Sequence, residues 1–335
     1  MSRALRQEDL PPALLQDLDG RPADRTTGPQ TRAPRVDGTS WLDQLPRRVA
    51  EALERWDLSR DDTQPLRSGY TALVVPVRRP RGDRGALKVA WPHTESDTEH
   101  LALRAWKGRG AVELLAADPP SATLLLERLD PDRDLMTGPV VATTEVLGTL
   151  LRRLDRPAPP WAPPLSAVLA RIGDRLDRLH HDPAAGRSFP RRLTQQARSL
   201  TRDLLAGSTG DTGDHPLDRR MVHTDLHQMN VLWRPDPGEW VAIDPKVLAG
   251  DPHWALAPAL WNRWDDVLAA ADARSHLRLR LGLLCDAAGL DEDRATAMTI
   301  VRLVAEAARS IEEGGADRET WVARAVTIVK AVQPG

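Results

Sequence analysis

The feature that most constrains this chain is a polar loop between apolar segments, in the stretch Val-His-Thr-Asp-Leu-His-Gln-Met-Asn-Val-Leu at 222–232. The loop contains Asp225 and Asn230, and the next apolar segment ends at Asp244. Two carboxylates and one amide at neighbouring loop and strand ends suit phosphoryl transfer, which needs a carboxylate to orient the attacking hydroxyl and oxygen ligands for magnesium. The spacing Asp-x-x-x-x-Asn also matches the catalytic loop of protein kinases.

Asp and Asn are common in turns, so this spacing by itself is weak evidence. Three further features favour a kinase-type site over an ordinary turn. His223 lies two residues before Asp225, apolar strands flank the loop, and Asp244 closes an apolar run. A protein kinase acting on polypeptides is a weaker interpretation, because no Asp-Phe-Gly sequence follows Ile243.

The bulk composition excludes several other classes of protein. The chain has 335 residues, enough for two lobes, and its net charge of -2 argues against a basic nucleic-acid surface and a polybasic membrane patch. No apolar run approaches the roughly 20 residues that cross a bilayer, and residues 1–9 lack the apolar core of a secretory signal. With Cys285 as the single cysteine, no internal disulfide forms, so we expect a cytoplasmic protein without nucleic-acid or membrane partners. The oligomeric state stays open.

Lysine is rare in this chain, which makes the position of each lysine informative. Lys88 lies in the apolar segment 86–90, which we expect to form a β-hairpin with 73–77. A lysine in such a strand usually faces solvent, but the lysine on the third strand of a kinase pairs with nucleotide phosphates and with a helix glutamate. Lys246 either approaches the phosphates or extends to solvent, and the sequence does not separate these two interpretations.

Two acidic residues are candidates for the partner of Lys88, since Glu95 and Glu99 lie one turn apart at the start of a predicted helix over 95–106. We favour Glu99, because Glu95 is closer to the helix start and can instead complement the helix dipole. The choice stays open at this stage.

Other nucleotide contacts are expected from the backbone of the N-terminal half. Ser68 and Gly69 form a bend before the hairpin, at the place where a kinase covers the phosphates, although an ordinary bend looks the same. Strands over 112–117 and 122–127 complete a five-stranded sheet that gives way to helices after Leu129. At that junction, Glu127 and Leu129 are candidates for backbone hydrogen bonds to adenine.

Helical periodicity describes most of the remaining chain. Residues 1–40 read as irregular with at most a short helix near 13–18, and 207–214 as a polar connector. Several side chains are candidates for the acceptor site, although the tryptophans among them suit a hydrophobic core equally well. These candidates are His227, Asp251, Trp254, Trp261 and Asp265. The predicted helices cover 41–56, 139–155, 165–181, 191–205, 277–288, 291–313 and 318–332.

From about Trp41 to the C-terminus, the chain resembles the aminoglycoside phosphotransferases, and more closely the branch of aminoglycoside/hydroxyurea antibiotic resistance kinases that includes streptomycin 6-phosphotransferases. The resemblance rests on Ala-Leu-Lys-Val-Ala-Trp-Pro-His (86–93), Glu-His-Leu-Ala-Leu-Arg-Ala-Trp (99–106), Leu-Leu-Leu-Glu-Arg-Leu-Asp-Pro (124–131), His-Thr-Asp-Leu-His-Gln-Met-Asn-Val-Leu (223–232) and Ile-Asp-Pro-Lys-Val-Leu-Ala-Gly-Asp-Pro (243–252).

This likeness implies an α+β, bilobal protein-kinase-like fold. Its small N-terminal lobe, 41–130, contains the antiparallel five-stranded sheet and follows the extension 1–40. The larger C-terminal lobe, 131–335, is mostly helical. Thr224 stands where the wider superfamily commonly has Gly, and Ala255 where many relatives have an acidic residue; neither removes a chemical group from the mechanism.

The resemblance also implies ATP-dependent phosphorylation of a small-molecule hydroxyl, with ATP and Mg²⁺ as cofactors. The acceptor is expected to be a streptomycin-like aminoglycoside or hydroxyurea, with an unrelated sugar or metabolite, or a non-catalytic nucleotide-binding module, as alternatives. By position, Asp225 is the catalytic base, Asn230 and Asp244 are magnesium ligands, and Lys88, steered by Glu99, binds the phosphates. We expect these side chains to converge on one nucleotide–metal complex.

Overall fold

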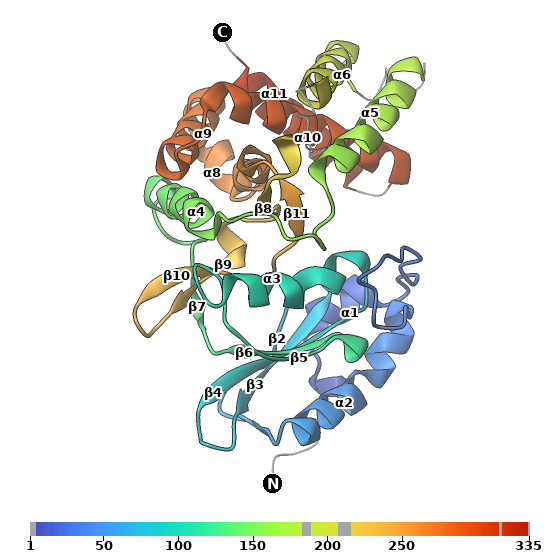
Figure 1. Ribbon diagram of the computed structural model, residues 1–335, viewed down its shortest axis with the longest axis vertical. Helices are drawn as coiled ribbons and strands as arrows, with labels where there is room; N and C mark the ends of the chain where they lie inside the picture. The colour runs from blue at the N-terminus through green and yellow to red at the C-terminus, as the bar shows by residue number, and fades with distance from the viewer. Residues whose placement is uncertain (1–4, 183–188, 207–215, 315–316, 334–335) are drawn as a thin grey trace. The chain divides into compact units, whose positions relative to one another are not determined.

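The computed structural model describes residues 5–182, 189–206, 216–314 and 317–333, so the predicted connector 207–214 lies outside the described residues. The chain divides into two compact units (Figure 1). Unit 1 consists of Met1–Arg133 and Leu232–Lys246, and unit 2 of Asp134–Val231 and Val247–Gly335. The predicted lobes, 41–130 and 131–335, differ from these units, since unit 1 also includes the N-terminal extension and a later excursion of the chain.

Unit 1 is built around an antiparallel sheet in the order β1-β3-β4-β6-β5, with β2 also paired to β3 (Figure 1). The predicted hairpin is confirmed as β3 and β4, but the sheet has six strands rather than five, because two two-residue strands join its edge. The strands are β1 Ser59–Arg60, β2 Arg67–Ser68, β3 Ala72–Arg78, β4 Arg84–Ala90, β5 Leu114–Asp118 and β6 Thr123–Glu127.

Alternation along β3 and β4 gives the sheet one apolar face. Leu73, Val75, Leu87 and Val89 are fully buried in one cluster together with residues of α1 (Pro12–Leu18) and α2 (Gly38–Arg55). Successive strand residues point to opposite faces, so Lys88 lies on the other face of β4. Asp37 caps the start of α2, because its Oδ1 accepts a hydrogen bond from the N–H of Ser40 at 2.8 Å.

The N-terminal extension is largely irregular, as predicted, and its helix α1 matches the expected position. It is nevertheless part of the core, because Leu10, Leu14 and Leu18 are buried against α2 and the sheet. Burying such a side chain contributes about 1.5–3 kcal/mol, which is enough to hold an otherwise irregular segment in place.

The prediction of helix directly after Leu129 was wrong. A strand, β7 (Asp130–Asp134), comes first and forms a three-stranded sheet in the order β10-β9-β7, with β9 Val231–Arg234 and β10 Glu239–Ala242. The sequence of β7 is Asp-Pro-Asp-Arg-Asp, which has no apolar alternation to reveal a strand. Pairing with β9 stabilises β7. A cation–π contact adds to this, since the guanidinium of Arg133 lies 4.0 Å from the ring centre of Trp233.

Unit 2 is mostly helical and surrounds α10, whose middle turns are buried. A two-stranded antiparallel sheet pairs β8 (Arg220–His223) with β11 (Val247–Gly250). No helix in the described part of the chain is long and apolar enough to cross a membrane. The helices of unit 2 are α4 Val140–Leu154, α5 Leu165–His181, α6 Arg191–Ala206, α7 Ala257–Trp261, α8 Trp264–Ala269, α9 Ala273–Ala288, α10 Glu292–Glu313 and α11 Arg318–Val332.

Helices α4 and α9 approach each other closely at Gly148, where an added Cβ would lie 2.6 Å from the Cβ of Ala287. We therefore expect Gly148→Ala to lower the free energy of unfolding by about 1–3 kcal/mol through overpacking. Gly282→Ala on α9 is the matched control, since the nearest atom to its added Cβ is 3.8 Å away. That change should raise stability by about 0.5–1 kcal/mol through helix propensity. Denaturant unfolding measures both, and equal effects would contradict the packing.

Candidate functional site

Lys88 forms the centre of a charged cluster in unit 1. Its Nζ lies 2.7 Å from Oε1 of Glu99 and 2.6 Å from Oδ1 of Asp244. Strand β4 presents Lys88 on the face opposite the apolar core, and α3 (Glu99–Trp106) supplies the first carboxylate from its first turn. Lys88 and Glu99 are buried, whereas the Asp244 side chain is 51% exposed.

The two carboxylates keep the lysine charged. Burial by itself would lower the pKa of Lys88, but the negative charges of Asp244 and Glu99 outweigh it and raise the pKa above its ordinary value. Burial raises the pKa of Glu99, an effect that the adjacent ammonium opposes. An ammonium therefore stays fixed and protonated beside a half-exposed carboxylate, an arrangement suited to binding an anion together with a cation.

Asp244 has a left-handed backbone conformation, with φ of 52°. For a residue other than glycine this conformation costs about 1–2 kcal/mol, and such residues concentrate at functional sites. Asp244 follows the apolar run from β10, and its Oδ1 contacts Nζ of Lys88.

Glu99, rather than Glu95, is the carboxylate that contacts Lys88. The side chain of Glu95 is 55% exposed and lies 3.0 Å from Nζ of Lys246. Lys246 therefore forms an ion pair at the surface of unit 1. Surface pairs of this kind contribute little to stability.

Unit 2 contains the polar loop with Asp225 and Asn230. The N–H of Asp225 donates to Nδ1 of buried His223 at 3.2 Å, at the end of β8. Nδ2 of Asn230 donates to the carbonyl of Asp225 at 2.9 Å and lies 3.2 Å from Nε2 of His227. These hydrogen bonds fix the conformation of the loop. They also leave Oδ1 of Asn230 as the amide atom suited to binding a cation.

Arg302 contacts the backbone at the start of the same loop. It was not identified from the sequence. This buried residue of α10 donates from Nη2 to the carbonyl of Thr224 at 2.6 Å and from Nη1 to the carbonyl of Trp254 at 2.8 Å. Its guanidinium lies 5.5 Å from the ring centre of Trp254 and 5.2 Å from that of Trp261. The available signal was a single arginine within Thr-Ile-Val-Arg-Leu-Val-Ala, where helical periodicity expects an apolar residue.

Most of the remaining acceptor candidates are buried or already bonded to other residues of the protein. Trp254 is buried, and Trp261 packs edge-on against Trp321 at 5.4 Å between ring centres. Both carboxylate oxygens of Asp251 are hydrogen-bonded, Oδ1 to the N–H of His253 at 3.0 Å and Oδ2 to Nε of Arg294 at 2.7 Å. Asp265 is exposed in the first turn of α8.

The predicted adenine and phosphate contacts are only partly available. The N–H of Glu127 donates to the carbonyl of Glu113 at 3.0 Å, and its carboxylate binds Arg234 on β9, with Oε2 at 2.8 Å from Nε. Leu129 is buried. Ser68 lies in β2 rather than in the bend, which begins at Gly69, where the N–H of Gly69 donates to the carbonyl of Ala72 at 3.0 Å. An added Cβ at Gly69 would meet no atom within 4 Å, so crowding does not require glycine there.

Within the described ranges, no group of three or more His, Cys, Asp or Glu side chains is arranged to hold a metal ion. The two residues that the sequence assigns to a cation are described with their own units, Asp244 with unit 1 and Asn230 with unit 2. Both offer oxygen atoms, which magnesium prefers, and magnesium usually takes only one or two protein carboxylates together with phosphates and water.

Two solved kinases of small molecules share this fold. The chain matches a ternary complex of a thermostable mutant of aminoglycoside phosphotransferase APH(4)-Ia with AMP-PNP and hygromycin B, with a TM-score of 0.53 and 16% identity over 86% of this chain and 98% of that one. It also matches choline kinase LicA from Streptococcus pneumoniae, with a TM-score of 0.51 and 11% identity over 86% of this chain and 99% of that one. These matches confirm the α+β kinase-like fold.

Sequence comparison defines the family. The model of the aminoglycoside/hydroxyurea antibiotic resistance kinases matches residues 55–314. Streptomycin 6-kinase of Streptomyces glaucescens is 38% identical over 89% of this chain and 92% of its own. Hydroxyurea phosphotransferase of Kitasatospora aureofaciens is 41% identical over 83% of this chain and 76% of its own. The chain belongs to this family and is a small-molecule kinase.

The surroundings of Asp251 predict a dependence of stability on pH. Burial by itself would raise the pKa of this carboxyl, but hydrogen bonds from His253 and Arg294 lower it below its ordinary value of 3.8. The ionised carboxylate therefore stabilises the fold above about pH 4, and this stabilisation is lost as the pH falls through the lowered pKa. At pH 7, Asp251→Asn should cost about 1.5–3 kcal/mol. Unfolding measured from pH 7 to 3 should show this difference shrinking, and a constant difference would contradict the ionised pairing.

The position of Arg302 predicts a large loss of stability in Arg302→Met. The carbonyls of Thr224 and Trp254 lose their hydrogen-bond donor, and the rings of Trp254 and Trp261 lose the nearby cation. Together these losses should lower the free energy of unfolding by about 2–4 kcal/mol. Arg309→Met on the same helix is the matched control, since Arg309 forms half-exposed pairs with Glu306 and Glu313 that are worth about 1 kcal/mol or less. Thermal unfolding separates the two variants, and equal shifts in Tm would contradict the anchoring role.

Proposed function

We propose that this small-molecule kinase transfers the γ-phosphoryl group of ATP to a hydroxyl of streptomycin or a related aminoglycoside, or to hydroxyurea. The observation that supports it most directly is the Lys88 cluster, in which a fixed ammonium lies between two carboxylates. The named activities of the relatives supply the two acceptors, and their identities of 38% and 41% do not separate them.

The residues of unit 1 fit the handling of nucleotide phosphates. Lys88 would neutralise phosphate oxygens, Glu99 would hold the lysine in place, and Asp244 would bind magnesium. The half-exposed Asp244 carboxylate and the oxygen of Asn230 suit this ion chemically. When bound, magnesium supplies positive charge that offsets the charge on the phosphates.

The residues of unit 2 fit the handling of the acceptor. Asp225 would accept a hydrogen bond from the acceptor hydroxyl and align its oxygen for attack on the γ-phosphorus. As the bond between that phosphorus and ADP breaks, Asp225 would take the hydroxyl proton and then pass it to solvent. The loose transition state of phosphoryl transfer needs mainly positioning and charge stabilisation. Among the acceptor candidates, His227 has the most direct support, since its Nε2 lies 3.7 Å from Oδ1 of Asp225.

Cationic aminoglycosides favour acceptor sites with carboxylates, whereas neutral hydroxyurea does not need them. Both oxygens of Asp251 are already hydrogen-bonded, which leaves Asp265 as the exposed acidic candidate. A non-catalytic nucleotide-binding module is a weaker proposal, because the chain retains all four chemical residues: Lys88, Asp225, Asn230 and Asp244.

An ADP-release assay over streptomycin, hydroxyurea and simple sugars, with ATP and Mg²⁺, tests the acceptor and the roles together. We expect release with streptomycin or hydroxyurea. Asp225→Ala should lower kcat by about 10²–10⁴-fold, because the hydroxyl loses its base, while ATP binding persists. Lys88→Met should instead weaken ATP binding.

Asp203→Ala on α6 is the matched control, since this exposed carboxylate is not among the described contacts of Lys88 or of the loop with Asp225. Unchanged turnover in Asp225→Ala would contradict the proposed base. ADP release with simple sugars but with neither drug would contradict the proposed acceptors.

A further inference from the structure

The segment between Lys88 and Glu99 determines how these two residues meet. Strand β4 ends at Ala90, and the link 91–98, which includes the short helix Thr94–Thr98, leads directly into α3. Any movement of this link shifts Glu99 relative to the lysine. What holds the link in place therefore bears on the geometry of the ion pair.

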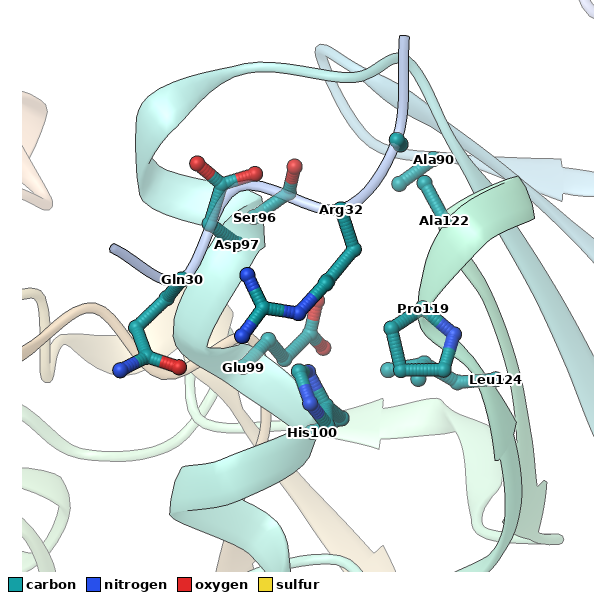
Figure 2. A pocket seen from close by; sticks show the side chains of 11 residues that line it. Gln30, Arg32, Ala90, Ser96, Asp97, Glu99, His100, Pro119, Ala122 and Leu124 are labelled. Atoms are coloured by element: carbon teal, nitrogen blue, oxygen red, sulfur yellow. The ribbon is translucent and has the colours of Figure 1, made fainter. Parts of the chain in front are cut away.

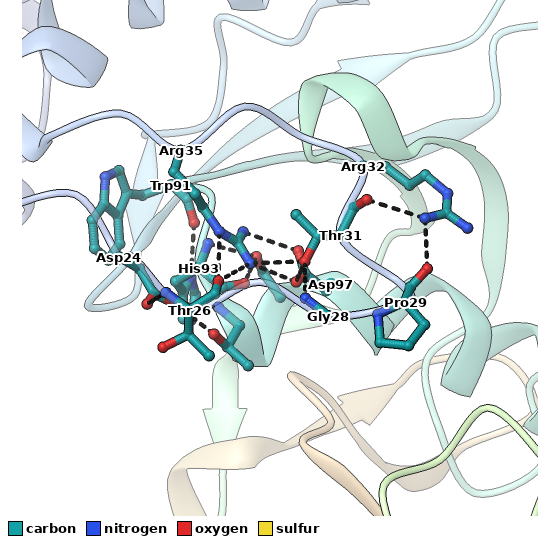
Figure 3. Close-up of polar contacts among 12 residues, drawn as sticks. Asp24, Thr26, Gly28, Pro29, Thr31, Arg32, Arg35, Trp91, His93 and Asp97 are labelled. Atoms are coloured by element: carbon teal, nitrogen blue, oxygen red, sulfur yellow. Dashed lines mark hydrogen bonds and ion pairs between the residues drawn. The ribbon is translucent and has the colours of Figure 1, made fainter.

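A stretch of the N-terminal extension, residues 24–36, lies along this link, and we call it the N-terminal strap (Figure 3). It contains no helix or strand. It contacts the link at the beginning, middle and end. The indole N–H of Trp91 donates to the carbonyl of Val36 at 2.8 Å, and Oδ2 of Asp24 accepts from both N and Oγ1 of Thr94 at 2.7 Å.

The third contact is a largely buried ion pair, whose acidic residue lies two residues before Glu99. The Arg35 guanidinium binds Asp97 through two parallel bonds, Nη2 to Oδ2 at 2.5 Å and Nη1 to Oδ1 at 3.0 Å. The two side chains are only 10% and 8% exposed. Arg35 also donates to the carbonyl of Thr26, while Oγ1 of Thr31 donates to Asp97 at 2.8 Å. A paired fork of this kind fixes direction as well as distance.

A small cavity lies beside these polar contacts at the start of α3. A cavity of about 20 Å³, lined by Arg32, Asp97, Glu99, His100 and Leu124, lies between the strap, α3 and the sheet (Figure 2). A cavity of this volume has room for about one water molecule beside the first turn of α3. The strap also lies outside residues 55–314, the stretch matched by the family model.

We propose that the N-terminal strap positions Glu99 against Lys88, with Arg35 and Asp97 as positioning residues for nucleotide binding. The strap holds the link at three points, and the Arg35–Asp97 pair fixes the start of α3. The proposal rests on the proposed role of Lys88 in binding ATP.

The test compares Arg35→Ala with Thr39→Val. Thr39 also forms hydrogen bonds in the N-terminal extension, to Asp19 and Gly20, and its described bonds do not involve the link. Hydrogen exchange followed by mass spectrometry should show faster exchange over 91–106 in Arg35→Ala, but not over α2 and not in Thr39→Val. In Arg35→Ala, the Kd for ATP with Mg²⁺ should rise about tenfold, which is a common effect of losing a residue that holds a ligand-binding side chain. The KM for the acceptor should not change.

Arg35→Lys retains the charge but not the paired fork, so it should give an intermediate Kd. If Arg35→Ala fails to fold, Asp24→Ala decides the question, because it releases Thr94 while retaining the buried pair. It should speed exchange over 91–106 and weaken ATP binding by a smaller factor.

If Arg35→Ala changes neither the exchange over 91–106 nor the Kd for ATP, the proposed positioning role is overturned. The same conclusion follows if exchange rises equally across unit 1 and the Kd for ATP does not change. Failure of the wild-type chain to bind ATP would instead contradict the proposed function. In that case the exchange measurement still decides whether the strap holds α3.

Discussion

A charged ammonium buried between two carboxylates is the interaction on which unit 1 depends. Removing a charge from water costs several kcal/mol unless it is paired. Lys88 therefore requires Glu99 from α3 and Asp244 from the end of the 232–246 excursion. The cluster thus joins a strand, a helix and a distant return of the chain. Together with the sheet β10-β9-β7 and the bond between Arg234 and Glu127, it ties residues far apart in the sequence into unit 1.

The two carboxylates differ in a way that matters for binding. Glu99 is buried and bonded to the lysine, so it acts as a fixed support. Asp244 is half exposed and held in a left-handed conformation, so it faces whatever approaches from solvent. A nucleotide phosphate arriving alone would be attracted by Lys88 and repelled by Asp244. Under the proposed function, a divalent cation would remove this conflict, because it would offset the charges of the carboxylate and the phosphates together.

Much of the fold could be predicted from the sequence, because it leaves local signals, and so could the contact between Lys88 and Glu99. Helical periodicity gave α9, α10 and α11 within a few residues at each end, and alternation gave the β3–β4 hairpin. Strand β7 could not be predicted, since its polar sequence forms a strand only through pairing with β9. Arg302 and the N-terminal strap were missed for a related reason: their importance depends on partners distant in sequence, Thr224 for the first and Asp97 for the second.

The most direct test of the Lys88 cluster is a calorimetric titration of ATP into the wild-type chain with Mg²⁺ and again with EDTA, repeated for Asp244→Ala. If Asp244 repels phosphate until a cation binds, wild-type affinity should depend strongly on Mg²⁺ and the variant should lose most of that dependence. Equal wild-type affinity with and without Mg²⁺ would contradict the assignment of this cluster to a nucleotide–metal complex.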